Sequence, residues 1–313
     1  MEPCGRIWIV YGWAAKMVDY EPKRFLELLF NFKGSVAKGI SGRVLVTMLV
    51  AVAAALLNQR TGFKLPPIAH TLVGAALALL LVFRTNASYD RFWEGRRLVG
   101  AIGNRLRDLA RQFASLVPEA ADGRDALARH LVLFFKLSVQ ALRSERELDA
   151  LGDDITADER AALEGVSQRP YVVLSWVSAR VQDLVAAGTL SGERQLLIDQ
   201  NLTALTDALG GCERIRNTPV PIAYAHHIKM FLTLFCLSVP FAMVNDMHWY
   251  TPIAAGILAF ALYGIDEIGV EIEDPFGYDP NDLPLDNIGK SIARSVGDIM
   301  KQGRALGGPP SAP

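Results

Sequence analysis

An apolar run of nearly membrane-spanning length passes directly into a charged, aromatic stretch, and this junction constrains the fold more than any other feature. The run is Leu65–Phe83, and "RTNASYDRFWEGRRLVG", Arg84–Gly100, follows it without a loop residue. About 20 apolar residues in a helix cross the hydrocarbon core of a bilayer. The junction therefore predicts a helix that leaves an apolar environment and continues in water.

Three further apolar segments accompany this run, at Val44–Leu57, Met230–Val244 and Trp249–Tyr263. Each is shorter than a typical membrane span, and buried helices of soluble proteins have the same length. A soluble all-helical protein with strongly apolar helices is therefore the alternative to a membrane protein.

Pairing, aromatic position and overall hydropathy favour the membrane. The segments form two close pairs, as helical hairpins do, and Trp249 and Tyr250 stand at the edge of the fourth segment. Aromatic side chains of this kind prefer the water–lipid interface. The mean hydropathy of +0.22 is also high for a soluble protein of 313 residues.

Lysine and arginine are unevenly distributed around the four segments. The short connection after the third segment contains none, and the connection after the first contains two. Because cytoplasmic loops are enriched in these residues, both termini and the central region are expected in the cytoplasm. The basic residues on that side are Arg6, Lys16, Lys23, Arg24, Lys33, Lys38, Arg43, Arg84, Arg91, Arg96, Arg97 and Lys229.

The central region, Thr85–Lys229, is too long for a loop and has the pattern of amphipathic helices. Thr156, followed three residues later by Glu159, is typical of a capping box at a helix start. Gly210 and Gly211 are expected to end a helix. Strand signals are nearly absent, so the expected fold class is all-α.

Six parts follow from this pattern. They are residues 1–43, a cytoplasmic N-terminal helical segment; 44–83, transmembrane helices 1 and 2; 84–229, a cytoplasmic helical domain; 230–263, transmembrane helices 3 and 4; 264–290, an acidic, clasp-like loop and C-terminal cytoplasmic segment; and 291–313, a C-terminal helix and a tail that is disordered by composition.

The chain carries no recognisable enzyme or nucleic-acid signature. Its formal net charge is −1, and it has no GxSxG, P-loop, HExxH or GxGxxG motif. The cysteines Cys4, Cys212 and Cys236 are far apart and form no CxxC pair, so neither a disulfide framework nor a zinc site is supported.

Three of the histidines, His70, His226 and His227, are candidate site residues. His226 and His227 are adjacent in sequence and point to different sides of a helix, which suits surface or pore-facing side chains better than one metal ion. His70 lies inside the second apolar segment, where a polar group must face protein or water. The His70 side chain is expected to face a neighbouring helix rather than a pore.

The stretch after the fourth segment, "EIEDPFGYDPNDLPLD", Glu271–Asp286, is rich in carboxylates and interrupted by prolines. Proline and glycine predict a turn-rich loop. Crowded oxygen donors suit Ca²⁺, although the spacing is not that of an EF-hand. An acidic loop that caps helices is the equal alternative.

Three motifs together resemble the bestrophin family in its bacterial form. They are "RTNASYDRFWEGRRLVG" after the second segment, "NTPVPIAYAHH" before the third and "DPFGYDPNDLPLD" after the fourth, and the resemblance covers roughly residues 20–290. It implies a homopentamer around a central ion pore, with four transmembrane helices and a large helical cytoplasmic part in each subunit. Animal members are calcium-activated anion channels, whereas bacterial relatives need not share that ion preference.

The resemblance also implies pore residues. A hydrophobic neck lined by the second helix corresponds to Ile68, Leu72 and Ala76, and helical spacing independently places these three on one face. Ala76 departs from the family, which usually has a bulky aromatic residue there. A cytoplasmic constriction corresponds to Val220, which stands between two prolines. Rings of apolar side chains gate a pore because ions and water lose hydration there.

The family's calcium clasp corresponds to Glu271, Asp274, Asp279 and Asp282. Asp279 and Asp282 are the expected metal ligands, and a backbone carbonyl near the N-terminus would complete the site. Glu271 and Asp274 stand where the animal pattern has amide ligands, which changes the charge of the site. In the alternative, these acids pair with basic residues of a neighbouring subunit.

Arg84, Asn86, Tyr89 and Trp93 are expected to couple the pore helix to its own cytoplasmic domain and to the next subunit. The expected protein is a multi-pass homopentameric channel of the bacterial inner (plasma) membrane, with no catalysis and no cofactor other than Ca²⁺. Its partners are its own subunits, membrane lipid and small monovalent ions. Both chloride and sodium remain candidates for the permeant ion, because an apolar neck carries no charge. A non-conducting membrane scaffold or regulatory protein is the alternative.

Overall fold

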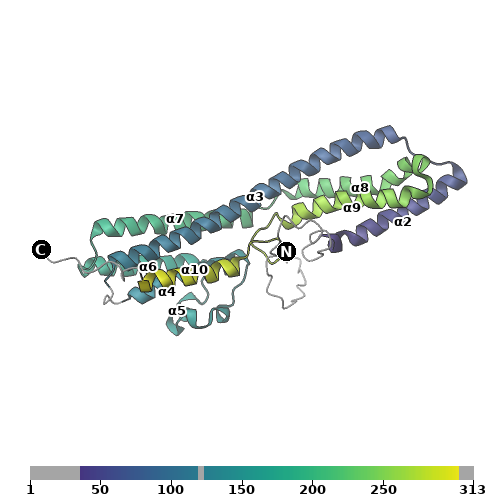
Figure 1. Ribbon diagram of the computed structural model, residues 1–313. Helices are drawn as coiled ribbons and strands as arrows, with labels where there is room; N and C mark the ends of the chain where they lie inside the picture. Colours follow the sequence, from purple (N-terminus) through teal and green to yellow (C-terminus); the bar gives the residue numbers. More distant parts are fainter. Residues whose placement is uncertain (1–35, 119–122, 303–313) are drawn as a thin grey trace.

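The computed structural model describes residues 36–118 and 123–302, and every regular element within these ranges is a helix, which confirms the all-α expectation (Figure 1). The elements are α2 (Ala37–Thr61), α3 (Pro67–Leu116), α4 (Arg124–Leu142), the 3-10 helix η1 (Leu148–Asp154), α5 (Ala157–Leu163), α6 (Arg169–Ala186), α7 (Gly192–Asn217), α8 (Ile222–Met247), the 3-10 helix η2 (His248–Tyr250), α9 (Thr251–Glu271) and α10 (Leu285–Gln302).

The long helix α3 joins two helix bundles (Figure 1). Its first half packs against α8 and α9, which in turn pack against α2, and we call these four helical parts the apolar bundle. Its second half packs with α4, α7 and α10 in the polar bundle, where α6 covers α4. Pro67 stands at the first position of α3, where a helix tolerates proline, and the next proline is Pro118. The helix therefore continues across Phe83 and Arg84, as the junction predicts.

Each bundle has its own hydrophobic core. The larger core lies in the polar bundle and includes Leu106, Phe113 and Phe134, all completely buried. The core of the apolar bundle is smaller and includes Leu77 and Leu232. The chain thus has two packing units that share one continuous helix.

The apolar bundle also carries large apolar side chains on its outside. Three described stretches are long and apolar enough to cross a membrane, namely Ala37–Thr61, Pro67–Leu116 and Ile222–Glu271, of which the last contains both α8 and α9. An exterior of this kind is stable against lipid and would aggregate in water. The structure therefore supports a membrane protein over the soluble alternative.

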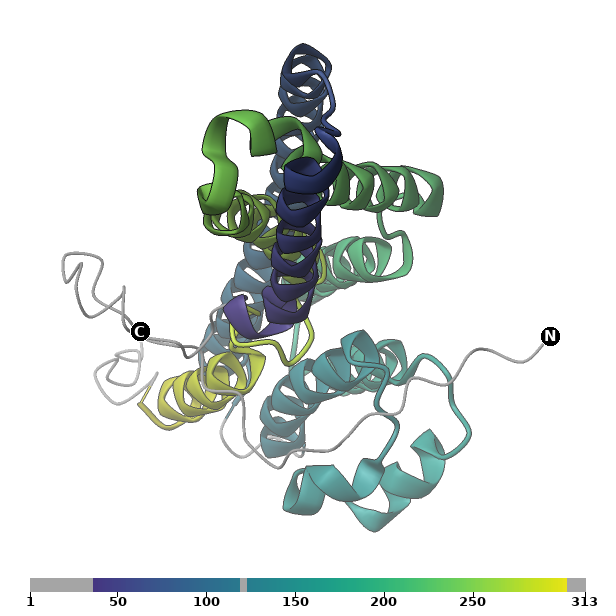
Figure 2. The same ribbon diagram turned by 90° about the vertical axis from the view of Figure 1, so that its right-hand side faces the viewer.

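The chain reverses direction between α8 and α9 at η2, where His248 has a φ of 46°. This turn faces the viewer in Figure 2, together with the end of α2. Trp249 and Tyr250 are 60% and 73% exposed there. Both aromatic residues thus lie at one end of the apolar bundle, where the hairpin prediction places them.

Several helices extend beyond the predicted boundaries. Helix α2 begins at Ala37 rather than at residue 44, α8 begins at Ile222 rather than at residue 230, and α10 begins at Leu285 rather than at residue 291. Hydropathy marks only the part of a helix that suits lipid, whereas a helix continues until its backbone is interrupted, as Pro221 and Pro284 do before α8 and α10. The predicted parts 1–43 and 291–313 fall partly outside the described residues.

Gly210 and Gly211 do not end a helix, contrary to the prediction. Helix α7 continues to Asn217, and Gly211 is buried. A Cβ atom at Gly211 would lie 2.8 Å from Cδ1 of Leu98. Glycine is therefore required here for the close approach of α3 and α7, not for a helix terminus.

The predicted capping box at the start of α5 is confirmed. The Glu159 amide donates to Oγ1 of Thr156 at 3.3 Å, and the Thr156 amide donates to Oε2 of Glu159 at 2.9 Å. Glu159 also accepts hydrogen bonds from Arg129 at 2.5 Å and pairs with His130 at 2.7 Å. Burial by itself raises the pKa of Glu159, but these hydrogen bonds outweigh it and lower the pKa to about 2.

Candidate functional site

The three predicted neck residues lie on one outward face of α3. Ile68 and Leu72 are 70% and 68% exposed in the single chain, and Ala76 is also exposed. The four-residue spacing keeps them in one row along the helix. The apolar bundle therefore leaves this row open while it covers the opposite side of α3.

That opposite side of α3 packs against α8. His70 Nε2 lies 3.1 Å from the Ser238 hydroxyl, and its ring lies 6.3 Å from the ring of Phe235. A Cβ atom at Gly74 would lie 3.1 Å from Phe235, so a small residue is needed where the helices meet. His70 therefore faces a neighbouring helix, as favoured from the sequence, and the neck row faces away from it.

A buried ion pair joins α3 to α9 just below the apolar run. Arg84 and Asp266 are each 2% exposed, and Nη1 of Arg84 lies 3.5 Å from Oδ1 of Asp266. Nη2 of Arg84 also lies 3.9 Å from Oε2 of Glu273. Nε and Nη1 of Arg84, the Ser88 hydroxyl and Oδ1 of Asp266 are buried without a hydrogen-bond partner. The pair is thus strongly desolvated and only loosely satisfied, which makes it costly to break.

The predicted constriction residue Val220 lies in the short link between α7 and α8. Its amide donates to Oε1 of Glu273 at 3.0 Å. Arg91 of α3 donates to the carbonyls of Thr218 at 2.7 Å, of Ile215 at 2.6 Å and of Glu273 at 3.2 Å. Side chains from α3 and from the segment after α9 therefore hold the backbone of this link and of the last turn of α7.

The four residues expected to couple the pore helix to the rest of the protein lie in different surroundings. Arg84 is buried in the ion pair, whereas Asn86, Tyr89 and Trp93 are exposed. The Arg96 guanidinium lies 5.7 Å from the centre of the Trp93 ring. Within the chain, coupling is thus carried by Arg84 and Arg91, and the contact of the other three with a neighbouring subunit stays a prediction.

The predicted calcium residues lie at the end of α9 and in the acidic loop that follows, and the carboxylates of Glu271, Asp274 and Asp282 have partners within the chain. Asn281 donates to Oε2 of Glu271 at 2.6 Å, and the Phe276 amide donates to Oδ1 of Asp274 at 3.3 Å. Asp274 also lies 3.9 Å from Nε of Arg216, which is an ion pair inside one chain rather than between subunits. The loop thus has the hydrogen bonds expected of the structural alternative.

Asp282 is the most buried carboxylate of the loop, at 4% exposed. Oδ2 accepts a hydrogen bond from the Asp279 amide at 2.7 Å, while Oδ1 is buried without a hydrogen-bond partner. Burial raises the pKa of Asp282 to about 7, and the nearby carboxylates of Asp279, Asp274 and Glu271 add to this rise, while the hydrogen bond from Asp279 opposes it. An unsatisfied buried oxygen of this kind could accept a proton or a cation.

The described residues alone do not assemble a metal site. Among them, no group of three or more His, Cys, Asp or Glu side chains is close enough to hold an ion. The orphaned Oδ1 atom of Asp282 suits a cation, but Ca²⁺ takes six to eight oxygen ligands. Calcium binding by Asp279 and Asp282 therefore stays a prediction that requires further oxygen donors.

Sequence reasoning missed three residues that hold this region together. Asp266 pairs with Arg84. Glu273 accepts a hydrogen bond from the Val220 amide. Arg91 donates to the link before α8. Asp266 could have been noticed as an acid directly after an apolar run, where an ionisable group calls for a partner. Periodicity alone could not have named the partners, because they are at least 53 residues apart in sequence.

Comparison with known proteins gives consistent matches along the chain. A family model described as bacterial/fungal bestrophin protein matches residues 16–298. A protein of Nostoc sp. named voltage-dependent anion channel-forming protein is 38% identical over 282 residues, which cover 88% of this chain and 92% of the relative. A protein of Synechocystis sp. with the same descriptive name is 35% identical over 286 residues, covering 90% and 93%.

Solved structures share the fold. A crystal structure of a bacterial bestrophin homologue from Klebsiella pneumoniae matches with a TM-score of 0.80 at 32% identity, and the match covers 84% of this chain and 98% of that chain. A crystal structure of a point mutant of that homologue matches with a TM-score of 0.79 at the same 32% identity. Because the family model and these relatives cover most of its length, the chain belongs to the bestrophin family, whose members are ion channels and not enzymes.

Proposed function

We propose that the chain is one subunit of a homopentameric channel that conducts small monovalent anions passively across a membrane. The descriptive names of the Nostoc and Synechocystis relatives support anions as the permeant ions. The observation that carries the proposal is the outward row of Ile68, Leu72 and Ala76 on α3, which the apolar bundle leaves exposed. A ring of five copies would close these rows around one axis.

The exposed side of α3 changes from apolar to polar along the helix. Beyond Phe83 it carries Asn86 and Asp90, which are polar and exposed. A conduit that leads from an apolar neck into water needs such a change. Helix α3 would thus line first an apolar neck and then an aqueous passage.

The neck would gate the pore by dewetting, that is, by excluding water from the apolar constriction. Side chains of Ile68 and Leu72 cannot replace the hydration shell of an ion, so a closed ring of them excludes ions without a charged barrier. Ala76 has a smaller side chain and leaves the inner end of the neck wider. Selectivity for anions would therefore come from groups outside the neck, because an apolar ring has no charge of its own.

Val220 would form a second constriction on the cytoplasmic side. The hydrogen bonds from Arg91 and to Glu273 hold the backbone around it, so its side chain would be presented at a fixed position. The polar bundle and both termini would lie in the cytoplasm of a bacterial cell, with the four helices of the apolar bundle in the inner membrane.

Reversal potential in a salt gradient tests the proposal directly. Purified protein in a planar bilayer with a KCl gradient is expected to pass current that reverses near the chloride equilibrium potential. Reversal near the potassium potential would overturn anion selectivity but not the channel. Absence of current, from protein whose pentameric size is established by light scattering, would favour the non-conducting scaffold.

A further inference from the structure

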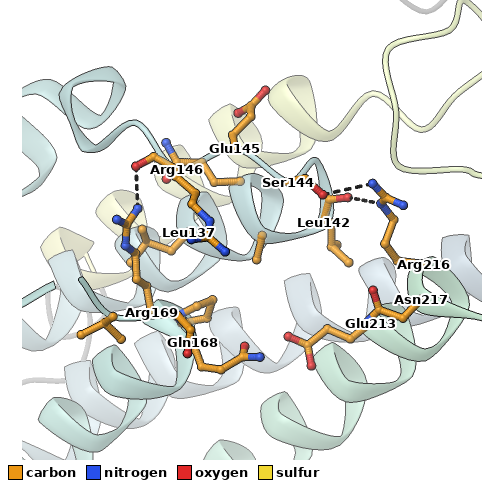
Figure 3. Close-up of a pocket in the computed structure, with 15 residues that line it drawn as sticks. Leu137, Leu142, Ser144, Glu145, Arg146, Gln168, Arg169, Glu213, Arg216 and Asn217 are labelled. Carbon is orange, nitrogen blue, oxygen red and sulfur yellow. Dashed lines mark hydrogen bonds between the residues drawn. The ribbon is translucent and has the colours of Figure 1, made fainter. Parts of the chain in front are cut away.

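We propose that the polar bundle contains a binding site for a small zwitterion, a molecule with one carboxylate and one ammonium group. The site is a cavity of about 280 Å³ between α4, the turn after it, the start of α6 and the last turns of α7 (Figure 3). This volume is at the lower end for ligand pockets, so it suits a molecule of amino-acid size. It lies outside both the neck row and the acidic loop.

Charged side chains of both signs line this cavity. They are the guanidinium groups of Arg146, Arg169 and Arg216 and the carboxylates of Glu145 and Glu213. Figure 3 shows that Arg146 and Arg169 come from one side of the cavity, and Glu213 and Arg216 from the other. A zwitterion can pair with groups of both signs, whereas a ligand with a single charge can pair with one set only.

Backbone contacts fix the walls in place. Arg169 donates to the carbonyls of Leu163 at 3.2 Å and Arg146 at 2.7 Å. Arg216 donates to the Leu142 carbonyl at 2.8 Å and to the Ser144 hydroxyl at 3.1 Å. Because these groups are held before any ligand arrives, little ordering would be required for binding.

Gln140 helps to form the wall that α4 contributes to the cavity. It is only 7% exposed, and its Nε2 donates to the Glu147 carbonyl at 2.9 Å. This hydrogen bond ties α4 to the segment that follows its turn, so the wall is in place before a ligand binds.

Glu213 supplies the negative charge that would bind the ammonium group. Its Oε2 accepts a hydrogen bond from the Tyr171 hydroxyl at 2.8 Å, which orients the carboxylate. An ammonium group bound to the Glu213 carboxylate would gain a charge-assisted hydrogen bond. The ligand carboxylate would then be met by Arg146 and Arg169 across the cavity.

Calorimetric titration of the full-length protein in detergent tests this assignment. The probes are glycine and 5-aminopentanoate, two zwitterions with close and distant charges, and pentanoate and pentylammonium, which carry one charge each. We expect at least one zwitterion to bind about tenfold or more tightly than both single-charge probes. The Glu213→Gln and Arg146→Gln variants should each weaken that zwitterion about tenfold, which is the loss of one charged contact.

Matched controls lie on α7 and outside the cavity. Glu193→Gln and Arg194→Gln remove the same charges from exposed positions and should leave the dissociation constant unchanged. Zwitterion binding that neither cavity variant weakens would overturn the assignment, as would equal binding of pentanoate or no binding of either zwitterion. If Glu213→Gln lowers the melting temperature, Arg146→Gln carries the test, because Arg146 is exposed at the cavity rim.

Discussion

The two halves of α3 place their apolar side chains in opposite ways. In the polar bundle, Leu106 and Phe113 are completely buried. In the apolar bundle, Leu77 is equally buried, but Ile68 and Leu72 on the other side of the helix are 70% and 68% exposed. One end of the helix thus has a single apolar face, and the other end is apolar nearly all round.

This difference indicates that the two bundles are stabilised by different means. The polar bundle gains free energy by removing large side chains from water. The apolar bundle gains little in that way when lipid surrounds it, and such bundles depend on close packing of small residues and on buried polar contacts. Ala51, Ala55, Ala255 and Ala259 are buried between its helices, as this requires.

The largest effect is expected at the buried ion pair between the two halves. Arg84→Gln leaves Asp266 buried without its charge partner, and we expect a loss of about 3–5 kcal/mol of unfolding free energy. The matched control is Arg43→Gln, which breaks the exposed 2.8 Å pair with Glu267 on the same helix α9. That change should cost about 0–1 kcal/mol. Denaturant unfolding in detergent measures both, and equal losses would contradict the buried role of Arg84.

The second prediction compares two leucines of α3 directly. Leu106→Ala should cost about 2–5 kcal/mol, because it opens a cavity in the larger core. Leu72→Ala should leave stability nearly unchanged and raise the open conductance. Single-channel recording checks the second part, with Leu45→Ala on the 57% exposed outer side of α2 as the control. Currents that stay unchanged in Leu72→Ala would remove this residue from the neck.

The third prediction concerns pH and applies to the polar bundle alone. The lowered pKa of Glu159 means that the unfolded chain binds the proton more readily, so stability rises with pH between about 2 and 4.5. The contribution is complete above pH 4.5 and is lost as the pH falls toward 2. Glu159→Gln should cost about 2 kcal/mol near neutral pH and flatten the acid limb of the stability curve. The exposed neighbour Glu164→Gln should keep that limb, and an identical loss in both variants would refute the assignment.

The smallest effect is expected at the loop that connects the two bundles. If Asp279 and Asp282 help to hold Ca²⁺, free calcium at ten times its dissociation constant should stabilise the protein by about 1.4 kcal/mol. The double change Asp279→Ala with Asp282→Ala should abolish that thermal shift. The control Asp298→Ala, which changes an exposed residue of α10, should preserve it. A parent protein whose melting temperature ignores calcium would rule out the site.

Local features of this fold could be predicted, and distant partners could not. The continuity of α3 follows from the absence of proline between Pro67 and Pro118, and the capping box follows from two residues that are neighbours in sequence. Which acid meets Arg84 depends instead on how α9 packs against α3. The same holds for Gly211, because only the close approach of Leu98 distinguishes a packing glycine from a terminating one.

The unbroken α3 also sets how force travels through the molecule. Its 50 residues form one rod, about 75 Å long at about 1.5 Å per residue, with no proline hinge. A tilt at Leu116, where α3 ends in the polar bundle, would swing the opposite tip through an arc instead of being absorbed midway. The ion pair of Arg84 with Asp266 of α9 is the fulcrum, and a small displacement at the polar-bundle end of α3 becomes a lateral movement of its other tip at Pro67.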